Sequence, residues 1–152
     1  MADNDNVAQA QPAAEPAPDI QSLGSRLVAT WELSGESHGT VVYEWMEGGH
    51  FLIQYVDMGQ QDSQRTTGIE VIGHEKTFGS EASAEIRSRL YSHTGDTLDY
   101  VYELEGDTLT IWGGEKGSPA YYRGTFSDDG NTLTGAWHWP GGGYEATSTR
   151  VG

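Results

Sequence analysis

Apolar and polar side chains alternate along much of the chain, which is the pattern of β-strands. The clearest case spans residues 39–57, where two runs rich in valine, tyrosine and isoleucine flank Gly48 and Gly49. A period of two places successive side chains on opposite faces of a strand, and a glycine pair readily adopts the positive φ angles of a tight turn. The stretch therefore predicts an antiparallel hairpin.

The same alternation recurs and predicts ten short strands. They are expected at residues 27–33, 41–46, 51–56, 67–74, 87–93, 98–104, 108–112, 120–126, 132–139 and 144–151. Turn signals such as Asp128-Asp129-Gly130 separate consecutive strands, and no long helical pattern intervenes. We predict an all-β fold, a ten-stranded antiparallel meander β-barrel, because closure removes the exposed edges of a sheet. A barrel of this size has room for an interior space.

The two ends of the chain differ in composition. Residues 1–18 form an acidic tail rich in Ala and Pro, which buries too little apolar surface to fold and is predicted to be disordered. Residues 19–152 then make one barrel domain. Asp19 is placed to cap a short helical turn that plugs one end of the barrel. A second helical turn is expected within residues 80–86, at one mouth.

Charge and composition exclude several classes of function. The formal net charge is −15 with only 8 Lys and Arg residues, so we expect no nucleic acid and no membrane as partner. The absence of cysteine excludes a disulfide framework and a thiolate nucleophile. The N-terminus lacks the apolar core of a secretory signal, and no apolar run approaches the roughly 20 residues of a membrane span. A cytoplasmic location is predicted.

Aromatic residues supply the main functional signal, because the 5 Trp and 8 Tyr are concentrated in the strands. Buried Tyr and Trp each bring a polar group that needs a partner, which is unlike a simple aliphatic core. We predict a cavity that binds a small hydrophobic or aromatic molecule. The candidate ligand-binding residues are Tyr43, Trp45, Gln54, His74, Tyr100, Tyr102, Trp112, Tyr122, Trp137 and His138. Arg89 and Arg123 are further candidate polar anchors. In the alternative, about half of the tyrosines lie on the outer wall, and the pattern leaves the inward face of most strands open.

The five histidines form neither an HxH nor an HExxH motif, so no metal site is predicted. His138 lies between Trp137 and Trp139 on one predicted strand. In one interpretation the two indoles fill the barrel and His138 is outside. In the other, His138 lies at the mouth or within the barrel as a ligand contact, haem ligand or general base. No cofactor is predicted, with haem kept as the alternative.

Four segments carry a resemblance to a known family, namely residues 27–31, 47–52, 69–73 and 122–137. With these motifs in this order, the chain resembles the DUF1579-type, lipocalin-like (calycin superfamily) proteins of bacteria over residues 27–151. It departs from them at Ala29, where the family usually has glycine. The resemblance implies a calycin barrel with Trp31 plugging its base. Related barrels carry lipids, pigments or haem, and a few catalyse cyclisations, which is an analogy at the level of the fold.

Three functions follow as hypotheses. The first is a small-molecule binding protein. The second is a natural-product biosynthetic enzyme, a cyclase or isomerase. The third is an oligomeric structural module with a filled barrel, and a homo-oligomer is also compatible with the first two. The chain has no nucleophile elbow, phosphate loop or dinucleotide fingerprint. The strand carboxylates are Glu44, Glu70, Asp99 and Glu103. One of them pointing inward with a perturbed pKa would favour the enzyme.

Overall fold

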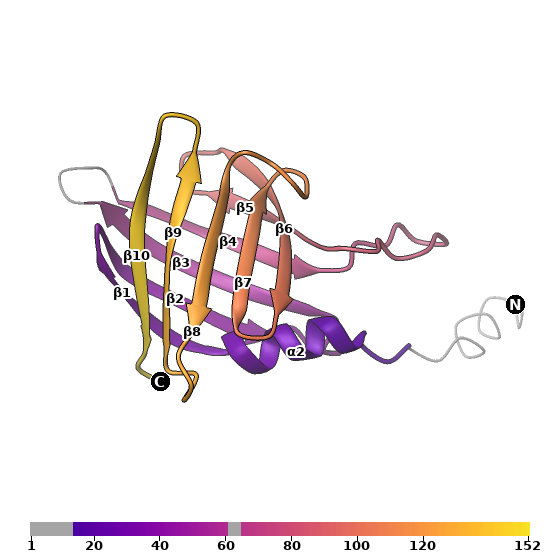
Figure 1. Ribbon diagram of the computed structural model, residues 1–152. Coiled ribbons are helices and arrows are strands. Elements are labelled where there is room, and N and C mark those ends of the chain that lie inside the picture. Colours follow the sequence, from indigo (N-terminus) through magenta and orange to yellow (C-terminus); the bar gives the residue numbers. More distant parts are fainter. Residues whose placement is uncertain (1–13, 61–64) are drawn as a thin grey trace, which may run out of the picture.

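The computed structural model describes residues 14–60 and 65–152, and within them ten antiparallel strands form a closed barrel (Figure 1). The strands are β1 (Ala29–Gly35), β2 (Ser37–Trp45), β3 (Phe51–Gln60), β4 (Thr66–Gly73), β5 (Ile86–Ser92), β6 (Thr97–Glu105), β7 (Thr108–Gly113), β8 (Tyr121–Phe126), β9 (Thr132–Trp139) and β10 (Gly142–Arg150). Each strand pairs with the next along the chain, and β10 pairs with β1 to close the barrel. The predicted all-β meander barrel is confirmed, with the ends of several strands shifted by a few residues.

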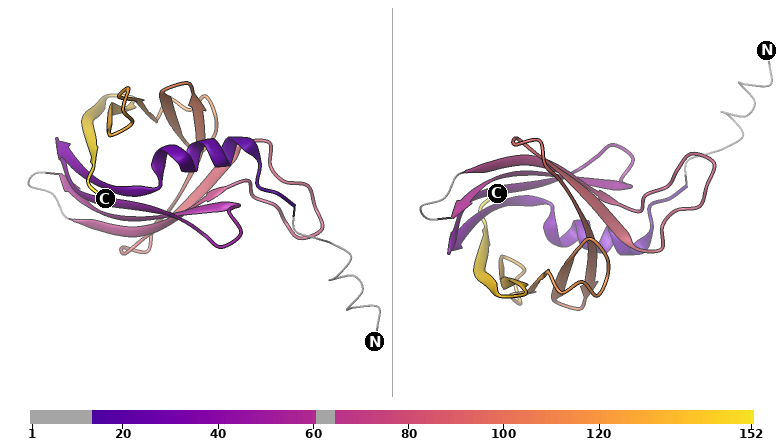
Figure 2. Two further views of the ribbon diagram at one scale, coloured as in Figure 1. Left: turned by 90° about the horizontal axis from the view of Figure 1, so that it is seen from below. Right: turned by 90° about the horizontal axis from the view of Figure 1, so that it is seen from above.

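The helix α2 (Pro18–Leu27) lies across one end of the barrel, at the bottom of Figure 1 and crossing the opening in Figure 2. It buries Ile20, Leu23 and Leu27, whose exposed fractions are at most 1%. This confirms the predicted helical plug. The predicted cap is wrong, because the helix begins at Pro18 and its N-cap residue is Ala17. Asp19 lies in the first turn, where its carboxylate accepts the backbone N–H of Ile20 at 2.8 Å.

The plugged end is held together by Trp31 and Arg150. The indole N–H of Trp31 donates to the carbonyl of Leu27 at 2.8 Å, which joins the helix to β1. The Arg150 guanidinium lies 4.8 Å from the centre of the Trp31 ring and donates to the carbonyl of Arg26 at 2.9 Å. A cation bound to the last carbonyls of a helix also complements the helix dipole. These contacts make this end of the barrel a solid floor.

The segment between β4 and β5 contains no helical turn, so that prediction is wrong. The N–H of Ser80 donates to the carbonyl of Thr77, and the N–H of Ser83 to that of Glu75, each at 2.8 Å. The hydroxyl of Ser83 also donates to the carbonyl of Glu85 at 2.7 Å. Serine side chains that bond nearby backbone groups compete with helix formation, and here they stabilise a loop.

Residues 1–13, most of the tail predicted to be disordered, lie outside the described residues. The remainder of that tail is described, and Ala17 packs against the hydrophobic core. Among the described residues there is no helix long and apolar enough to span a membrane.

Candidate ligand-binding site

The barrel encloses a cavity of about 360 Å³. Its floor is formed by Leu27 of α2 and Trp31 of β1. Its lining extends to Thr66 at the start of β4 and Trp139 at the end of β9, which are the ends of these strands away from α2. Trp139 is 43% exposed. The cavity therefore runs from the floor that α2 helps to form toward the other end of the barrel.

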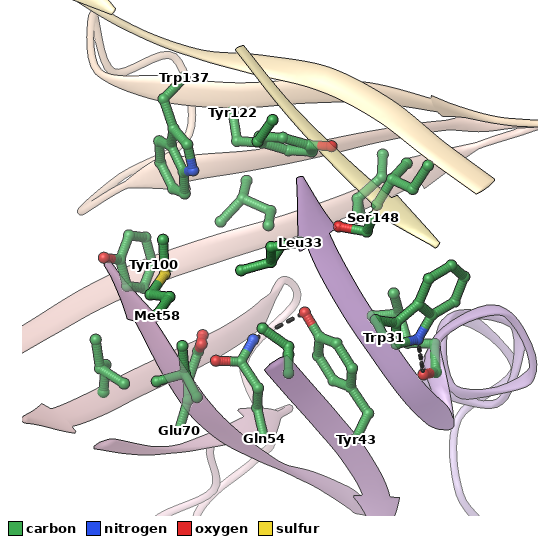
Figure 3. A pocket seen from close by; sticks show the side chains of 18 of the residues that line it. Trp31, Leu33, Tyr43, Gln54, Met58, Glu70, Tyr100, Tyr122, Trp137 and Ser148 are labelled. Carbon is green, nitrogen blue, oxygen red and sulfur yellow. Dashed lines mark hydrogen bonds between the residues drawn. The ribbon is translucent and has the colours of Figure 1, made fainter. Parts of the chain in front are cut away.

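One wall of the cavity carries a row of polar side chains. Tyr43 on β2 is paired with Gln54 on β3, and Gln54 is paired in turn with Glu70 on β4. Directly paired residues point to the same face of a sheet, so all three side chains project inward (Figure 3). The amide of Gln54 donates to the hydroxyl of Tyr43 at 2.8 Å. This row makes the wall formed by β2–β4 partly polar.

Glu70 is the most unusual member of this row, because its side chain is only 3% exposed. The hydroxyls of Ser88 and Tyr102 donate to the same carboxyl oxygen, Oε2, at 2.5 and 2.7 Å. Burial raises the pKa of the Glu70 carboxyl above its ordinary value, and the two hydrogen bonds oppose that rise by stabilising the charge. Among the described residues, no side chain or N–H donates to Oε1, and Figure 3 shows the carboxyl pointing into the cavity.

The phenols around Glu70 keep their protons. Burial raises the pKa values of Tyr43, Tyr100 and Tyr102, and the nearby charge of Glu70 raises them further. The cavity lining therefore offers neutral O–H groups close to a carboxyl. Among the described lining residues, Glu70 has the one carboxyl, and none is Lys, Arg or His.

Aromatic rings make up much of the remaining lining. The Trp137 ring centre lies 5.9 Å from that of Tyr100 and 5.6 Å from that of Tyr122, with the rings tilted against one another. Such tilted contacts are the favoured geometry of aromatic pairs. We call Tyr43, Tyr100, Tyr102, Tyr122 and Trp137 the inner aromatic cluster. Figure 3 shows Trp137 and Tyr122 across the cavity from Glu70 and Gln54.

The ten candidates chosen from the sequence divide between two environments. Those that line the cavity are Tyr43, Gln54, Tyr100, Tyr102, Tyr122 and Trp137. Those that do not are Trp45, His74, Trp112 and His138.

Trp112 and His138 lie on the outer wall of the barrel. There Trp112, Tyr121, Arg123 and His138 form a stack over β7–β9, which we call the outer ladder. The Tyr121 ring centre lies 5.3 Å from that of Trp112 and 5.1 Å from that of His138, and the Arg123 guanidinium lies 4.9 Å from the Tyr121 centre. His138 therefore points away from the cavity, as in the interpretation with the indoles of Trp137 and Trp139 inside. At this position His138 is not placed to ligate a haem inside the cavity.

Trp45 and His74 belong to the end that α2 closes. Trp45 shares a face with Tyr43 but lies beyond the floor, against Gly24 of the helix. A Cβ atom at Gly24 would come within 2.0 Å of the Trp45 ring, so glycine permits this contact. The His74 ring bonds the carbonyl of Ser83 and the carboxylate of Asp19, each at 2.7 Å. His74 thus ties the β4–β5 loop to the start of α2.

Sequence reasoning did not single out Ser88 or Tyr144, and it left Glu70 undistinguished among the strand carboxylates. An available signal was the two-residue spacing of Glu70 from Ile72, which places both side chains on one face. Of the further polar anchors considered, Arg89 forms an exterior ion pair with Asp99 at 2.7 Å. Arg123 belongs to the outer ladder.

No group of three or more His, Cys, Asp or Glu side chains able to hold a metal occurs within residues 14–60 and 65–152. In comparisons of the sequence with known proteins, no family model matches it and no curated protein is a significant match. The function is therefore inferred from the geometry of the cavity itself.

Proposed function

We propose that the protein binds a small, largely apolar molecule in the barrel cavity. The observation that carries this proposal is the cavity itself, about 360 Å³ inside a closed barrel and lined mainly by apolar and aromatic side chains. Its volume lies in the range of small-molecule sites, which are mostly apolar with a few polar groups that orient the ligand. Gln54, Glu70 and Tyr102 are such groups. A structural module with a filled barrel would have no need of this space.

The lipocalin-like (calycin) assignment and bacterial origin belong to the same proposal. A closed up-and-down barrel with Trp31 packed at its base supports the assignment. The fold by itself is compatible with many functions, so the proposal rests on the lining of the cavity.

A cavity-filling substitution tests the proposal. Ser148 lines the cavity, whereas Thr149, the next residue on β10, is exposed on the outer wall. We expect Ser148→Phe to weaken the binding of a naphthalene-based probe at least tenfold by occupying part of the cavity. Thr149→Phe adds the same ring outside and is expected to leave the dissociation constant within twofold of the wild type.

Two measurements complete this test. Calorimetric titration gives the dissociation constants, and native mass spectrometry of protein from its own host detects a ligand that co-purifies. Equal affinities of the two variants and the wild type would place the probe outside the cavity. Absence of any probe binding by the wild type, with no co-purifying ligand, would also refute the proposal.

The buried carboxyl of Glu70 favours a second candidate function, proton-transfer catalysis by a cyclase or isomerase. A carboxyl with a pKa raised by burial, facing a cavity next to neutral phenols, has the properties of a general acid or base. Catalysis predicts that a co-purified or host-derived compound is converted during incubation, with the same composition but a different structure. Binding alone predicts that the compound is recovered unchanged.

A further inference from the structure

The part of the cavity lining that the structure describes contains a group that can be negatively charged and none that can be positively charged. Among the described lining residues, Glu70 has the one carboxyl, and no Lys, Arg or His accompanies it. The arginines of neighbouring β5 point outward, where Arg87 pairs with Glu85 and Glu115 and Arg89 pairs with Asp99. An ionised Glu70 would therefore be a buried negative charge with hydrogen bonds but without a cation, which is costly.

The geometry of Glu70 leaves one atom available to a ligand. Ser88 and Tyr102 both donate to Oε2, which fixes the orientation of the carboxyl group. The carboxyl group points into the cavity (Figure 3), and Oε1 takes no donor from the described residues. When Glu70 is protonated, the proton is best placed on Oε1, because Oε2 already accepts two hydrogen bonds. When it is ionised, Oε1 is an acceptor that the described residues leave without a donor, on a carboxyl group that lines the cavity.

The opposite side of the cavity is suited to the rest of such a ligand. Trp137 packs against Tyr100 and Tyr122, and these rings border the same space as Glu70. The faces of Trp and Tyr rings attract cations, and they also bury the carbon skeleton of an apolar ligand. The protein as a whole carries a formal net charge of −15, which favours the approach of cations over anions.

We infer that the cavity selects a small organic cation, an aromatic or alicyclic amine whose ammonium group binds Oε1 of Glu70 while its carbon skeleton packs against Trp137, Tyr100 and Tyr122. This inference rests on the proposed binding function. An ammonium group supplies the missing countercharge and forms a charge-assisted hydrogen bond, which is stronger than a neutral one. A neutral ligand gains one ordinary hydrogen bond at Oε1. An anionic ligand meets a carboxyl and no cation.

Three naphthalene compounds of similar size test the inference by calorimetry with the full-length protein. They are 1-naphthylmethylamine, which is cationic at pH 7.5, the neutral 1-naphthylmethanol, and the anionic 1-naphthoate. We expect the amine to bind at least tenfold more tightly than the alcohol, and the carboxylate to bind most weakly. The preference for the amine should fall below threefold in Glu70→Gln.

Matched variants separate the role of Glu70 from effects on folding and net charge. Glu32→Gln removes the same charge from an exposed position on β1 and should keep the full preference for the amine. Unchanged binding of the alcohol by Glu70→Gln shows that this variant is folded. Ser88→Ala is a second variant that keeps the carboxyl but removes one donor to Oε2. Ser88→Ala should weaken binding of the amine about threefold and leave the affinity for the alcohol unchanged.

The pH dependence gives an independent readout. Burial raises the pKa of Glu70 above its ordinary value, so as the pH falls from 8 toward about 4.5 Glu70 gains a proton that competes with the amine, which itself stays protonated. The affinity for the amine should therefore fall and that for the alcohol should not. The titratable groups that face Glu70 are Tyr43, Tyr100 and Tyr102, whose raised pKa values keep them neutral over this interval. Affinities that change in parallel for both compounds would contradict the inference.

The outcomes distinguish the two proposals. Equal binding of amine and alcohol by the wild type, tighter binding of the carboxylate, or a preference for the amine that survives in Glu70→Gln would overturn the organic-cation inference and leave the binding function standing. Failure of the wild type to bind any of the three compounds, with no ligand that co-purifies, would overturn both.

Discussion

The inner aromatic cluster and the outer ladder are built from the same kinds of residues on neighbouring strands, yet their surroundings differ. In the outer ladder the side chains contact one another closely: the indole N–H of Trp112 donates to Glu103 at 2.5 Å, and the Arg123 guanidinium covers the rings of Trp112 and Tyr121. In the inner cluster the rings border empty space and face one buried carboxyl. The rings of the outer ladder are packed against other side chains of the protein, whereas the inner aromatic cluster borders a cavity with room for a ligand.

Strand register decides which of the two regions a residue joins. Tyr121 and Tyr122 are consecutive, so they point to opposite faces of β8. Tyr122 is paired with Ile111 on β7 and Trp137 on β9, both of which line the cavity. Tyr121 is paired with Trp112 and His138, the other rings of the outer ladder. A shift of one residue in this register would exchange the two sets.

The largest expected effect comes from truncating these two neighbours. Tyr122 is 5% exposed within the hydrophobic core, so Tyr122→Ala should lower the free energy of unfolding by about 3 kcal/mol or more. Tyr121 is half-buried on the outer wall, and Tyr121→Ala should cost about 1 kcal/mol. Urea denaturation followed by circular dichroism measures both. Similar losses would mean that the two regions do not differ in packing as described.

The sequence predicted the strands well, because alternation and turn glycines are local signals. It predicted the inward face less well, because many strands are apolar on both faces. In β4, Ile69 and Val71 alternate with Glu70 and Ile72, and local preference would bury the first pair. The structure instead exposes 45% of Ile69 and buries Glu70.

The reason is that the partners of Glu70 are distant in the sequence. Ser88 and Tyr102 lie 18 and 32 residues further along the chain, and only the barrel register brings their hydroxyls to the carboxyl. By contrast, the placement of His138 outside the barrel could be predicted as one of two options, since its flanking indoles, Trp137 and Trp139, favour the interior. The position of candidate residues near the helix, such as Trp45, depends on packing against α2, which the alternation pattern does not encode.

A second prediction concerns the pH dependence of stability. Folding raises the pKa of Glu70 by burial, so the folded state holds this proton more tightly than the unfolded chain does. Its contribution to stability is complete below the ordinary carboxyl pKa of about 4.5 and is lost as the pH rises through the folded-state value. Each pKa unit of difference is worth about 1.4 kcal/mol. Glu70→Gln cannot ionise and avoids this loss.

The measurement compares the stability difference between Glu70→Gln and the wild type at two pH values. The free energy of unfolding of Glu70→Gln minus that of the wild type should increase from pH 4 to pH 8, in favour of the variant at high pH. Histidines and the other carboxylates are common to both proteins, so their contributions cancel. Glu32→Gln, on the outer wall, should give a difference that is flat over the same interval. A difference for Glu70→Gln that is flat or falls with pH would mean that the buried carboxyl does not titrate as proposed.

The smallest expected effect is in the outer ladder. Arg123→Gln removes the cation that lies 4.9 Å from the Tyr121 centre and 5.6 Å from the Trp112 centre, and it should lower the free energy of unfolding by about 0.5–1 kcal/mol, the usual value of an exposed cation–π contact. Arg123→Lys should retain part of that energy. Because the ladder lies outside the cavity, neither variant should alter the affinity for the naphthalene probes measured by calorimetry. A loss of probe binding in Arg123→Gln comparable to that in Ser148→Phe would show that the two walls are coupled through β8, and that the outer ladder acts as more than a structural cover.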